Sequence, residues 1–464
     1  MTAHASGDFS RLLEERATSA KQFAILALVM LALIVDGLDI QLLALVSPLI
    51  LAQWGIDKAS FGPALSAALI GMALGASLGG SLGDRFGRKR ILILAMLSFG
   101  LATAAASLSE TVTQMALLRL FSGLGFGAAA PNGIALCSEW LPSRHRSLAS
   151  ALLSIGTPLG GMLGATTILS LVPAYGWQGC FVACGILTLL LAAVMLVALP
   201  ESPAFLVRIG QAARARNLFE RFVSSNHALD VRPKPAETKP DPLSEVGGVR
   251  LLSRENCRFN LGVWLAFFSI QFVAYTFAAW TPVLLTLVGI PLTEAVRATV
   301  AFNLCAVVGA VTAGVGINRL GSRWLILLTS VGAFVAVLLM AFGVIGYQPA
   351  ATSGATYFLI IMIASGMAGG LTGACIAAVY VLLASAYPVS CRASGIGFAL
   401  MVGRAGGIAT TMLGGALLDL AGDSTVPFFL ALAVVGACAI AGTLVIDRHI
   451  QPRRPDSRRC VSRR

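Results

Sequence analysis

The chain has 464 residues, of which 57% are hydrophobic and only 12% are charged, and its mean hydropathy is +0.85. This composition excludes a water-soluble globular protein and indicates a protein that crosses a membrane several times. The formal net charge of +12 would suggest a nucleic-acid partner for a soluble protein. Here the basic residues are segregated by loop, as membrane topology requires, so we expect no nucleic acid.

Apolar segments long enough to span a bilayer recur twelve times along the chain. A polar segment rich in proline and charge separates the first six from the last six. The sequence therefore predicts an all-α membrane protein with twelve transmembrane helices in two six-helix bundles. The predicted spans are 23–46, 61–82, 91–109, 112–138, 147–172, 178–199, 259–288, 295–317, 325–346, 355–383, 393–418 and 426–446.

The same pattern predicts the domain organisation. In the polar segment, one helix is predicted from Ala204 to Phe222, lying along the membrane face, and the remainder is interpreted as a solvated tether. The predicted domains are an N-terminal tail at 1–21, a first bundle at 22–199, a linker at 200–257, a second bundle at 258–446 and a basic tail at 447–464.

Lysine and arginine fall almost entirely on one side of the predicted bundles. Of the 33, 29 lie in the two tails and in the loops on the same side, whereas only Lys58 and Arg297 lie in loops on the opposite side. The positive-inside rule therefore predicts that both termini are cytoplasmic. The remaining two, Arg119 and Arg404, lie inside spans.

The first span contains two carboxylates in the sequence Asp36-Gly37-Leu38-Asp39. A carboxylate inside a span is costly, so such residues rarely serve stability. At positions i and i+3 the two acids share a helix face, where they can share protons or a cationic partner. We interpret Asp36 and Asp39 as a proton-coupling site.

Two arginines are predicted at the depth of these acids. With a rise of about 1.5 Å per residue, Asp36, Arg119 and Arg404 lie roughly 20 Å from the cytoplasmic edge. Because buried charges need partners or water, a common central cavity is the economical explanation. The alternative is a structural ion-pair cluster that holds the first, fourth and eleventh spans together.

Arginine presents a planar, always charged fork that suits a carboxylate. Arg404 is therefore interpreted as the main binding residue for an organic-acid anion, with Arg119 assisting or pairing alternately with the acids of the first span. Gln271 and Tyr275 in the seventh span are weaker candidates for lining the cavity, because packing and membrane-interface positions explain most aromatic residues there.

Two internal matches support the division into halves. The loop Gly83-Asp84-Arg85-Phe86-Gly87-Arg88-Lys89 is followed 234 positions later by Ile317-Asn318-Arg319-Leu320-Gly321-Ser322-Arg323. The loop Pro142-Ser143-Arg144-His145-Arg146 is followed 246 positions later by Pro388-Val389-Ser390-Cys391-Arg392. Parallel halves of six helices are the architecture of a rocking transporter.

The first of these loops, with Gly79 four residues before it, resembles the signature loop between helices two and three of the major facilitator superfamily. The copy at 317–323 resembles its counterpart in the second half, and Pro200-Glu201-Ser202-Pro203 is similar to that superfamily as well. The resemblance implies a secondary transporter that works by alternating access. It assigns gating roles to five loop residues: Gly83, Asp84, Arg85, Gly87 and Arg88.

Two charges near span ends each have two interpretations. Glu139 is either a solvated charge at the end of the fourth span or a gate partner, and the resemblance favours the gate. Arg392, before the eleventh span, has the same two interpretations. Asp84 is predicted to face the N-terminus of the eleventh span and to stabilise one conformation of the carrier.

The acids of the first span resemble the helix-one signature of the aromatic acid/proton symporters within this superfamily. The resemblance implies a monomer in the bacterial inner membrane that imports an aromatic carboxylate, such as a benzoate or hydroxybenzoate, together with protons. It implies no cofactor beyond the proton gradient.

Other functional classes lack their sequence signals. No nucleotide-binding loop, hydrolase nucleophile elbow or zinc pair occurs, and the four histidines lie outside the spans, so we expect neither an ATP-driven pump nor an enzyme nor a metal site. Two alternatives remain open. One is a carrier of another class, such as an aliphatic acid symporter or a drug/proton antiporter, and the other is a transporter-shaped sensor that binds without translocating.

Overall fold

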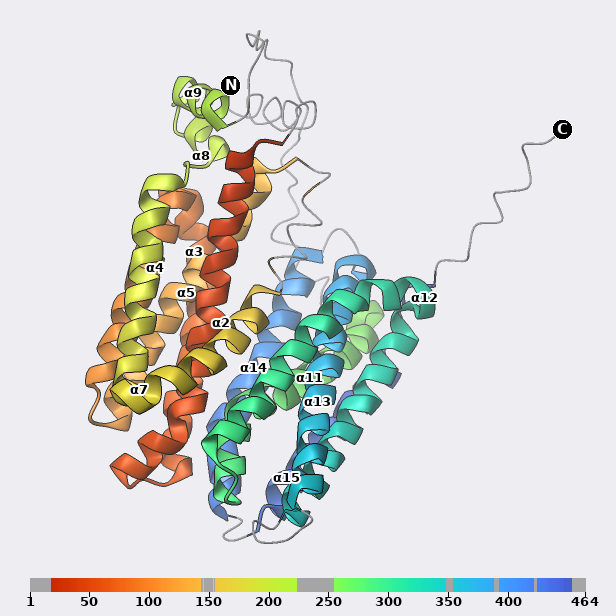
Figure 1. The fold of residues 1–464 in the computed structure, drawn as a ribbon. Coiled ribbons are helices and arrows are strands. Elements are labelled where there is room, and N and C mark those ends of the chain that lie inside the picture. The colour runs from red at the N-terminus through yellow and green to blue at the C-terminus, as the bar shows by residue number, and fades with distance from the viewer. Residues whose placement is uncertain are drawn as a thin grey trace, which may run out of the picture. The chain divides into compact units, whose positions relative to one another are not determined.

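The structure is a computed structural model that describes residues 18–142, 145, 153, 155–222, 254–347, 354–387, 392–420 and 424–452. Helices account for nearly all of these residues (Figure 1). They are α2 (Ala20–Trp54), α3 (Lys58–Phe86), α4 (Arg88–Ala105), the short 3-10 helix η1 (Ala106–Leu108), α5 (Val112–Trp140), α7 (Gly156–Ala198), α8 (Pro203–Arg208), α9 (Ala212–Phe222), α11 (Arg254–Leu287), α12 (Leu292–Gly346), α13 (Gly354–Ala386), α14 (Arg392–Leu420) and α15 (Val426–Val445).

Ten of these helices are long and apolar enough to cross a membrane. Two of the ten are interrupted by a glycine with non-helical backbone, Gly176 in α7 (φ 64°) and Gly321 in α12 (φ 78°). Glycine adopts positive φ readily, so each of these helices is two spans joined by a tight turn. The described residues therefore contain twelve spans, and the predicted all-α membrane architecture is confirmed. The predicted start of the fifth span, at 147, lies outside the described residues.

The chain folds into two compact units. The first contains the described parts of Met1–Pro242 together with Ala278–Val300 and Thr411–Leu420. The second contains the described parts of Leu243–Phe277, Ala301–Thr410 and Ala421–Arg464. Consequently α11, α12 and α14 each contribute residues to both units.

In the first unit, glycines allow the helix backbones to touch. A Cβ atom at Gly75 of α3 would collide with the carbonyl oxygen of Leu124 of α5, and one at Gly123 of α5 would collide with the carbonyl oxygen of Ala68. The contact between α2 and α7 is built in the same way, because a Cβ at Gly160 would meet the carbonyl oxygen of Ile34. Small residues at such positions are typical of closely packed membrane helices.

The second unit repeats these contacts at the predicted offsets. Gly309 of α12 faces the Gly370 carbonyl of α13, and Gly369 faces the Phe302 carbonyl. These two contacts are equivalent to the α3–α5 contacts described above. The α12 residues lie 234 positions after their α3 counterparts, and the α13 residues lie 246 positions after their α5 counterparts. Likewise, Gly406 of α14 meets the carbonyl of Phe268 in α11, at the same offsets from the α2–α7 contact. The internal repeat predicted from the loops is therefore present in the helix packing.

In the first unit, the segment that follows the sixth span holds the turn between the second and third spans. The backbone N–H of Lys89, in the first turn of α4, donates a hydrogen bond to Glu201 Oε1 at 3.0 Å. A carboxylate is favourable there because the N-terminus of a helix carries a partial positive charge. The chain reverses between α3 and α4 at Gly87, whose φ is 105°.

In the second unit, backbone pairing holds the equivalent turn. The Ser322 N–H donates to the Ile450 carbonyl at 3.0 Å, and the Ile450 N–H donates to Ser322 Oγ at 2.8 Å. Arg448 extends from the same segment over the ring of Phe259, 5.7 Å from its centroid, and donates to the carbonyl of Ala386. The residues just after α15 are therefore an integral part of the second unit.

The predicted helix from Ala204 to Phe222 is instead two helices. Gly210, with φ 78°, lies between α8 and α9 and breaks the helical path. Phe219 stacks on Trp140 at the end of α5, and Lys21 Nζ donates to the carbonyl of Arg221 at 2.6 Å. These contacts pack α9 against the first unit at the end where α2 begins (Figure 1). The part of the linker at 223–253 lies outside the described residues.

The pairing of Ser322 with Ile450 can be tested by substitution. Ser322→Ala removes the hydroxyl that accepts from the Ile450 N–H, so we expect the free energy of unfolding to fall by about 1 kcal/mol. The measurement is the melting temperature of the purified protein in detergent. The control is Ser385→Ala, which removes a hydroxyl that bonds only within its own helix. Equal melting temperatures for the two variants would contradict the proposed role of the segment.

Candidate functional site

The first unit contains an ion pair deep within its spans. Arg119 Nη1 of α5 lies 2.7 Å from Asp39 Oδ1 of α2, and Arg119 Nη2 donates to the Asp39 backbone carbonyl at 3.2 Å. Arg119 is 1% exposed and Asp39 is 3% exposed. The structure therefore unites two of the predicted site residues in one buried contact.

Side chains from two further helices surround this pair. Thr103 Oγ1 of α4 donates to Asp39 Oδ1 at 3.1 Å, and the Arg119 guanidinium lies over the Phe181 ring of α7, 5.9 Å from its centroid. Thr103 was absent from the predicted site, because a single hydroxyl in an apolar span is only a weak signal. Arg119 Nε has no hydrogen-bond partner within the described structure. Asp39 therefore does not use the Nε–H donor of the guanidinium.

Asp36 has different surroundings, although it is also 3% exposed. Its Oδ2 atom lies 3.5 Å from Thr157 Oγ1, at the start of α7. The close approach depends on Gly37, where a Cβ atom would collide with the Thr157 carbonyl. Asp36 and Asp39 were predicted to share one helix face, and the structure places Asp36 at the α2–α7 contact and Asp39 against Arg119 of α5.

The buried pair can exist in two charge states. With Asp39 ionised, the guanidinium and carboxylate neutralise each other, which is what makes either charge tolerable away from water. A proton delivered to Asp39 would remove its charge and weaken its hold on Arg119. The arrangement is therefore suited to linking proton uptake to a change in what Arg119 binds.

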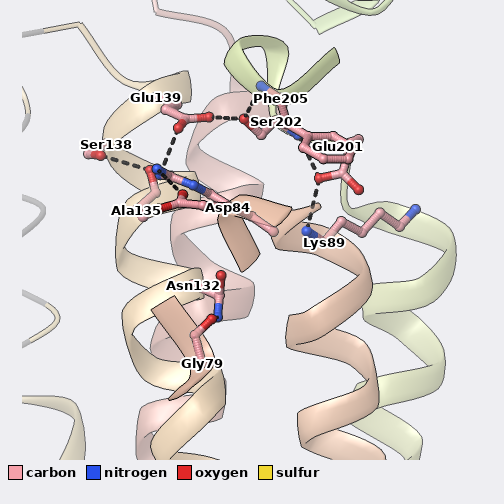
Figure 2. Close-up of polar contacts among 11 residues, drawn as sticks. Gly79, Asp84, Lys89, Asn132, Ala135, Ser138, Glu139, Glu201, Ser202 and Phe205 are labelled. Atoms are coloured by element: carbon pink, nitrogen blue, oxygen red, sulfur yellow. Dashed lines mark hydrogen bonds and ion pairs between the residues drawn. The ribbon is translucent and has the colours of Figure 1, made fainter. Parts of the chain in front are cut away.

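A second polar cluster lies at the turn between α3 and α4 (Figure 2). Arg88 bridges two acids, with Nη1 2.6 Å from Glu139 Oε1 and Nη2 3.3 Å from Asp84 Oδ1. Glu139 also accepts a hydrogen bond from the Ser202 hydroxyl, in the segment before α8. The turn, the end of α5 and the segment after α7 are thus tied by one set of contacts.

Two residues that were not among the predicted site residues also bond at this turn. Glu201 accepts from the Lys89 N–H, and Asn132 Nδ2 of α5 donates to the carbonyl of Gly79 at 2.8 Å (Figure 2). A Cβ at Gly83 would collide with Asn132 Oδ1, which explains the glycine there. Arg85 lies outside the cluster, because it is exposed and its guanidinium rests over the ring of Phe86.

The predicted substrate-binding residues other than Arg119 lie in the second unit. Gln271 of α11 is buried, and Tyr275 is half-buried with its ring packed on Gly407 of α14. Arg404 of α14 is half-exposed, and none of the ion pairs formed among the described residues includes it. Arg392 is the first residue of α14, and its side chain lies outside the described part of the structure.

Across the residues that the structure describes, no group of three or more His, Cys, Asp or Glu side chains is placed to hold a metal ion.

Comparison with known proteins agrees with this architecture. The family model described as Major Facilitator Superfamily matches residues 29–353 and 298–460. The chain is 32% identical over 443 residues to the 4-hydroxybenzoate transporter PcaK of Pseudomonas aeruginosa, covering 94% of this chain and 95% of that protein. It is 30% identical over 452 residues to the gallate transporter of Pseudomonas putida, covering 96% of each. A crystal structure of a D-xylose-proton symporter shares the fold, with a TM-score of 0.70, 17% identity and coverage of 93% of this chain and 98% of that chain.

The buried pair predicts a specific pattern of stability. Asp39→Asn leaves the Arg119 charge buried without an ionised partner, so we expect a loss of about 3 kcal/mol in the free energy of unfolding. The double variant Asp39→Asn/Arg119→Gln removes both charges and should recover most of that loss. Thermal unfolding in detergent measures both effects, with Glu110→Gln at an exposed turn as the control. If the double variant were less stable than Asp39→Asn alone, the two charges would not be coupled as described.

Proposed function

Because the chain belongs to the major facilitator superfamily and is a membrane transporter rather than an enzyme, we propose that it is a proton-coupled symporter. Its proposed substrate is an aromatic carboxylate, such as a benzoate or hydroxybenzoate, imported by alternating access. The substrate class is supported by relatives named as transporters of gallate, 4-hydroxybenzoate and benzoate, which align with 94% or more of this chain. No cofactor other than the proton gradient is proposed.

The observation that carries the proposal is the buried contact between Asp39 and Arg119. A protonatable acid placed against a permanent cation inside a membrane span is a functional arrangement by default. We assign proton binding to Asp39 and to Asp36, three residues before it on α2. Protonation of Asp39 would free Arg119, and this change in pairing would bias the carrier between its conformations.

The carboxylate of the substrate is assigned to Arg404. A half-exposed guanidinium in a span of the second unit favours an anionic ligand, and its fork geometry matches a carboxylate. Gln271 and Tyr275 are assigned supporting contacts with the ring. In this scheme the proton site belongs to one half of the chain and the anion site to the other.

The contacts of Arg88 with Glu139 and Asp84 are assigned to gating. They tie the turn between α3 and α4 to the end of α5 and to the segment after α7. Contacts that form in one conformation and break in the other set the balance between the two. The same role is proposed for Gly83, Arg85, Gly87 and Arg392.

The proposed orientation places this cluster on the cytoplasmic side. The basic residues of the tails and neighbouring loops would lie there under the positive-inside rule, with both termini cytoplasmic. The proposed location is the inner membrane of a bacterium, and the proposed state is a monomer.

Uptake into proteoliposomes tests the coupling. We expect an inward proton gradient to drive accumulation of labelled 4-hydroxybenzoate by the wild-type protein. Asp36→Asn and Asp39→Asn should abolish accumulation, because neither amide can carry a proton, while Glu110→Gln should behave as wild type. Gradient-driven accumulation by Asp39→Asn would remove this residue from the proton site.

The same assay separates the alternative functions. An exporter would lower the internal substrate concentration under an inward proton gradient, and a sensor would bind substrate without any uptake. A symporter for aliphatic acids would accumulate short-chain carboxylates and ignore the benzoates. Each of these results would replace the proposed function.

The gating assignment predicts a separation of transport from binding. Glu139→Gln weakens the contact with Arg88, so we expect the initial uptake rate to fall about tenfold while the dissociation constant for 4-hydroxybenzoate changes less than about twofold. Ser81→Ala, on an exposed part of α3, is the control. A large change in the dissociation constant would place Glu139 in substrate recognition rather than gating.

A further inference from the structure

Arg404 lies on a part of α14 that packs closely on α11. Gly403, the residue before it, has no room for a Cβ atom because the ring of Phe267 lies against its Cα. Three residues further along α14, Gly406 is in contact with the backbone carbonyl of Phe268. The position of Arg404 relative to α11 is therefore fixed by close contacts at a glycine on either side of it.

The ring of Phe267 also contacts a tyrosine of a third helix. Phe267 and Tyr380 of α13 pack edge to face, with ring centroids 5.7 Å apart and ring planes at 74°. Phe267 is fully buried, so it supports the tyrosine from behind rather than lining open space. Arg404 is close enough to Tyr380 to act on it electrostatically. Phe267 thus packs against both the Arg404 segment and Tyr380.

Tyr380 lies at an exposed position of α13. It is 45% exposed, as is Val381 beside it, whereas Ala378, Val379 and Leu382 are fully buried. A phenol beside a guanidinium inside a span is better accommodated next to water than next to lipid. The hydroxyl of Tyr380 is therefore suited to contact a polar group of a ligand.

Helix direction brings the two side chains toward each other. α13 ends at Ala386 and α14 begins at Arg392, so the two helices run in opposite directions from one end of the unit. Counting residues, Tyr380 lies about 9 Å and Arg404 about 18 Å from that end. Because side chains lean toward the N-terminus of their own helix, Tyr380 leans away from that end and Arg404 leans toward it. The phenol and the guanidinium converge on the level between them.

We propose that Tyr380 determines substrate specificity, its hydroxyl forming a hydrogen bond with a ring hydroxyl of an aromatic acid whose carboxylate is bound by Arg404. This inference rests on the proposed function and extends it to a chemical preference for hydroxylated over unsubstituted benzoates. A site that offers a hydrogen-bond partner to a substrate hydroxyl discriminates against the analogue that lacks it, because the partner is then left unpaired. Phe267 acts as a positioning residue by holding the phenol in place.

The test is a comparison of dissociation constants, measured by calorimetry on the purified full-length carrier with benzoate, 3-hydroxybenzoate, 4-hydroxybenzoate and gallate. Tyr380→Phe removes only the hydroxyl, so we expect affinity for at least one hydroxylated acid to fall about tenfold, and affinity for benzoate to change less than about twofold. The control is Tyr357→Phe, on the same helix, whose ring packs on Phe342. It should leave all four constants unchanged.

Two results would overturn the inference while leaving the proposed function intact. One is an equal loss of affinity for benzoate and for the hydroxylated acids, which would mean that the Tyr380 hydroxyl does not recognise the ring hydroxyl. The other is unchanged affinity for all four acids. Failure of the proposed function has a different signature, in which the wild type binds none of the four acids or Arg404→Ala binds them as tightly as the wild type. The melting temperature of each variant establishes that it is folded.

Discussion

The contact between Asp39 and Arg119 is the constraint around which the first unit is built. Two charges that are 1% and 3% exposed within membrane spans are tolerable only together. This requirement fixes α5 against α2 at one level and places Thr103 of α4 where its hydroxyl can support the carboxylate. One side chain, Asp39, thereby contacts residues of two other helices, α4 and α5.

Glycines bring the helix backbones of the same unit into direct contact. At Gly37, between the two acids, α2 touches α7 so closely that a Cβ atom would collide with a carbonyl group. The same contact scheme recurs in the second unit, but the chemistry does not. Asp36 and Asp39 correspond to Ile270 and Val273, and Arg404 corresponds to Pro158. One repeated framework therefore holds acids in one half and an unmatched arginine in the other, as a directional carrier needs.

Most of the fold was predictable from the sequence because spans are long apolar runs and loops are polar. The span count, the two halves and the offsets of 234 and 246 positions all follow from patterns that extend over many residues. The prediction of one continuous helix from Ala204 to Phe222 was wrong, because a single residue, Gly210, determines whether the helix continues or the chain turns. The buried charges were also identified from the sequence. A carboxylate or guanidinium in an apolar span is rare because burying its charge costs free energy, so each one stands out.

The sequence by itself thus determined the membrane architecture, the internal repeat and the identity of the charged residues inside it. Only the tertiary structure decided their partners: that Arg119 pairs with Asp39, that Asp36 lies at the contact with α7, and that Glu201, Ser202 and Ile450 hold the turns of their halves. The physical reason is that the free-energy cost of a charge inside a membrane span depends on that residue and its apolar neighbours in the sequence. It can therefore be recognised from a short stretch of sequence. Pairing depends on which faces of distant helices meet, and that is set by backbone contacts at individual glycines that no local pattern encodes.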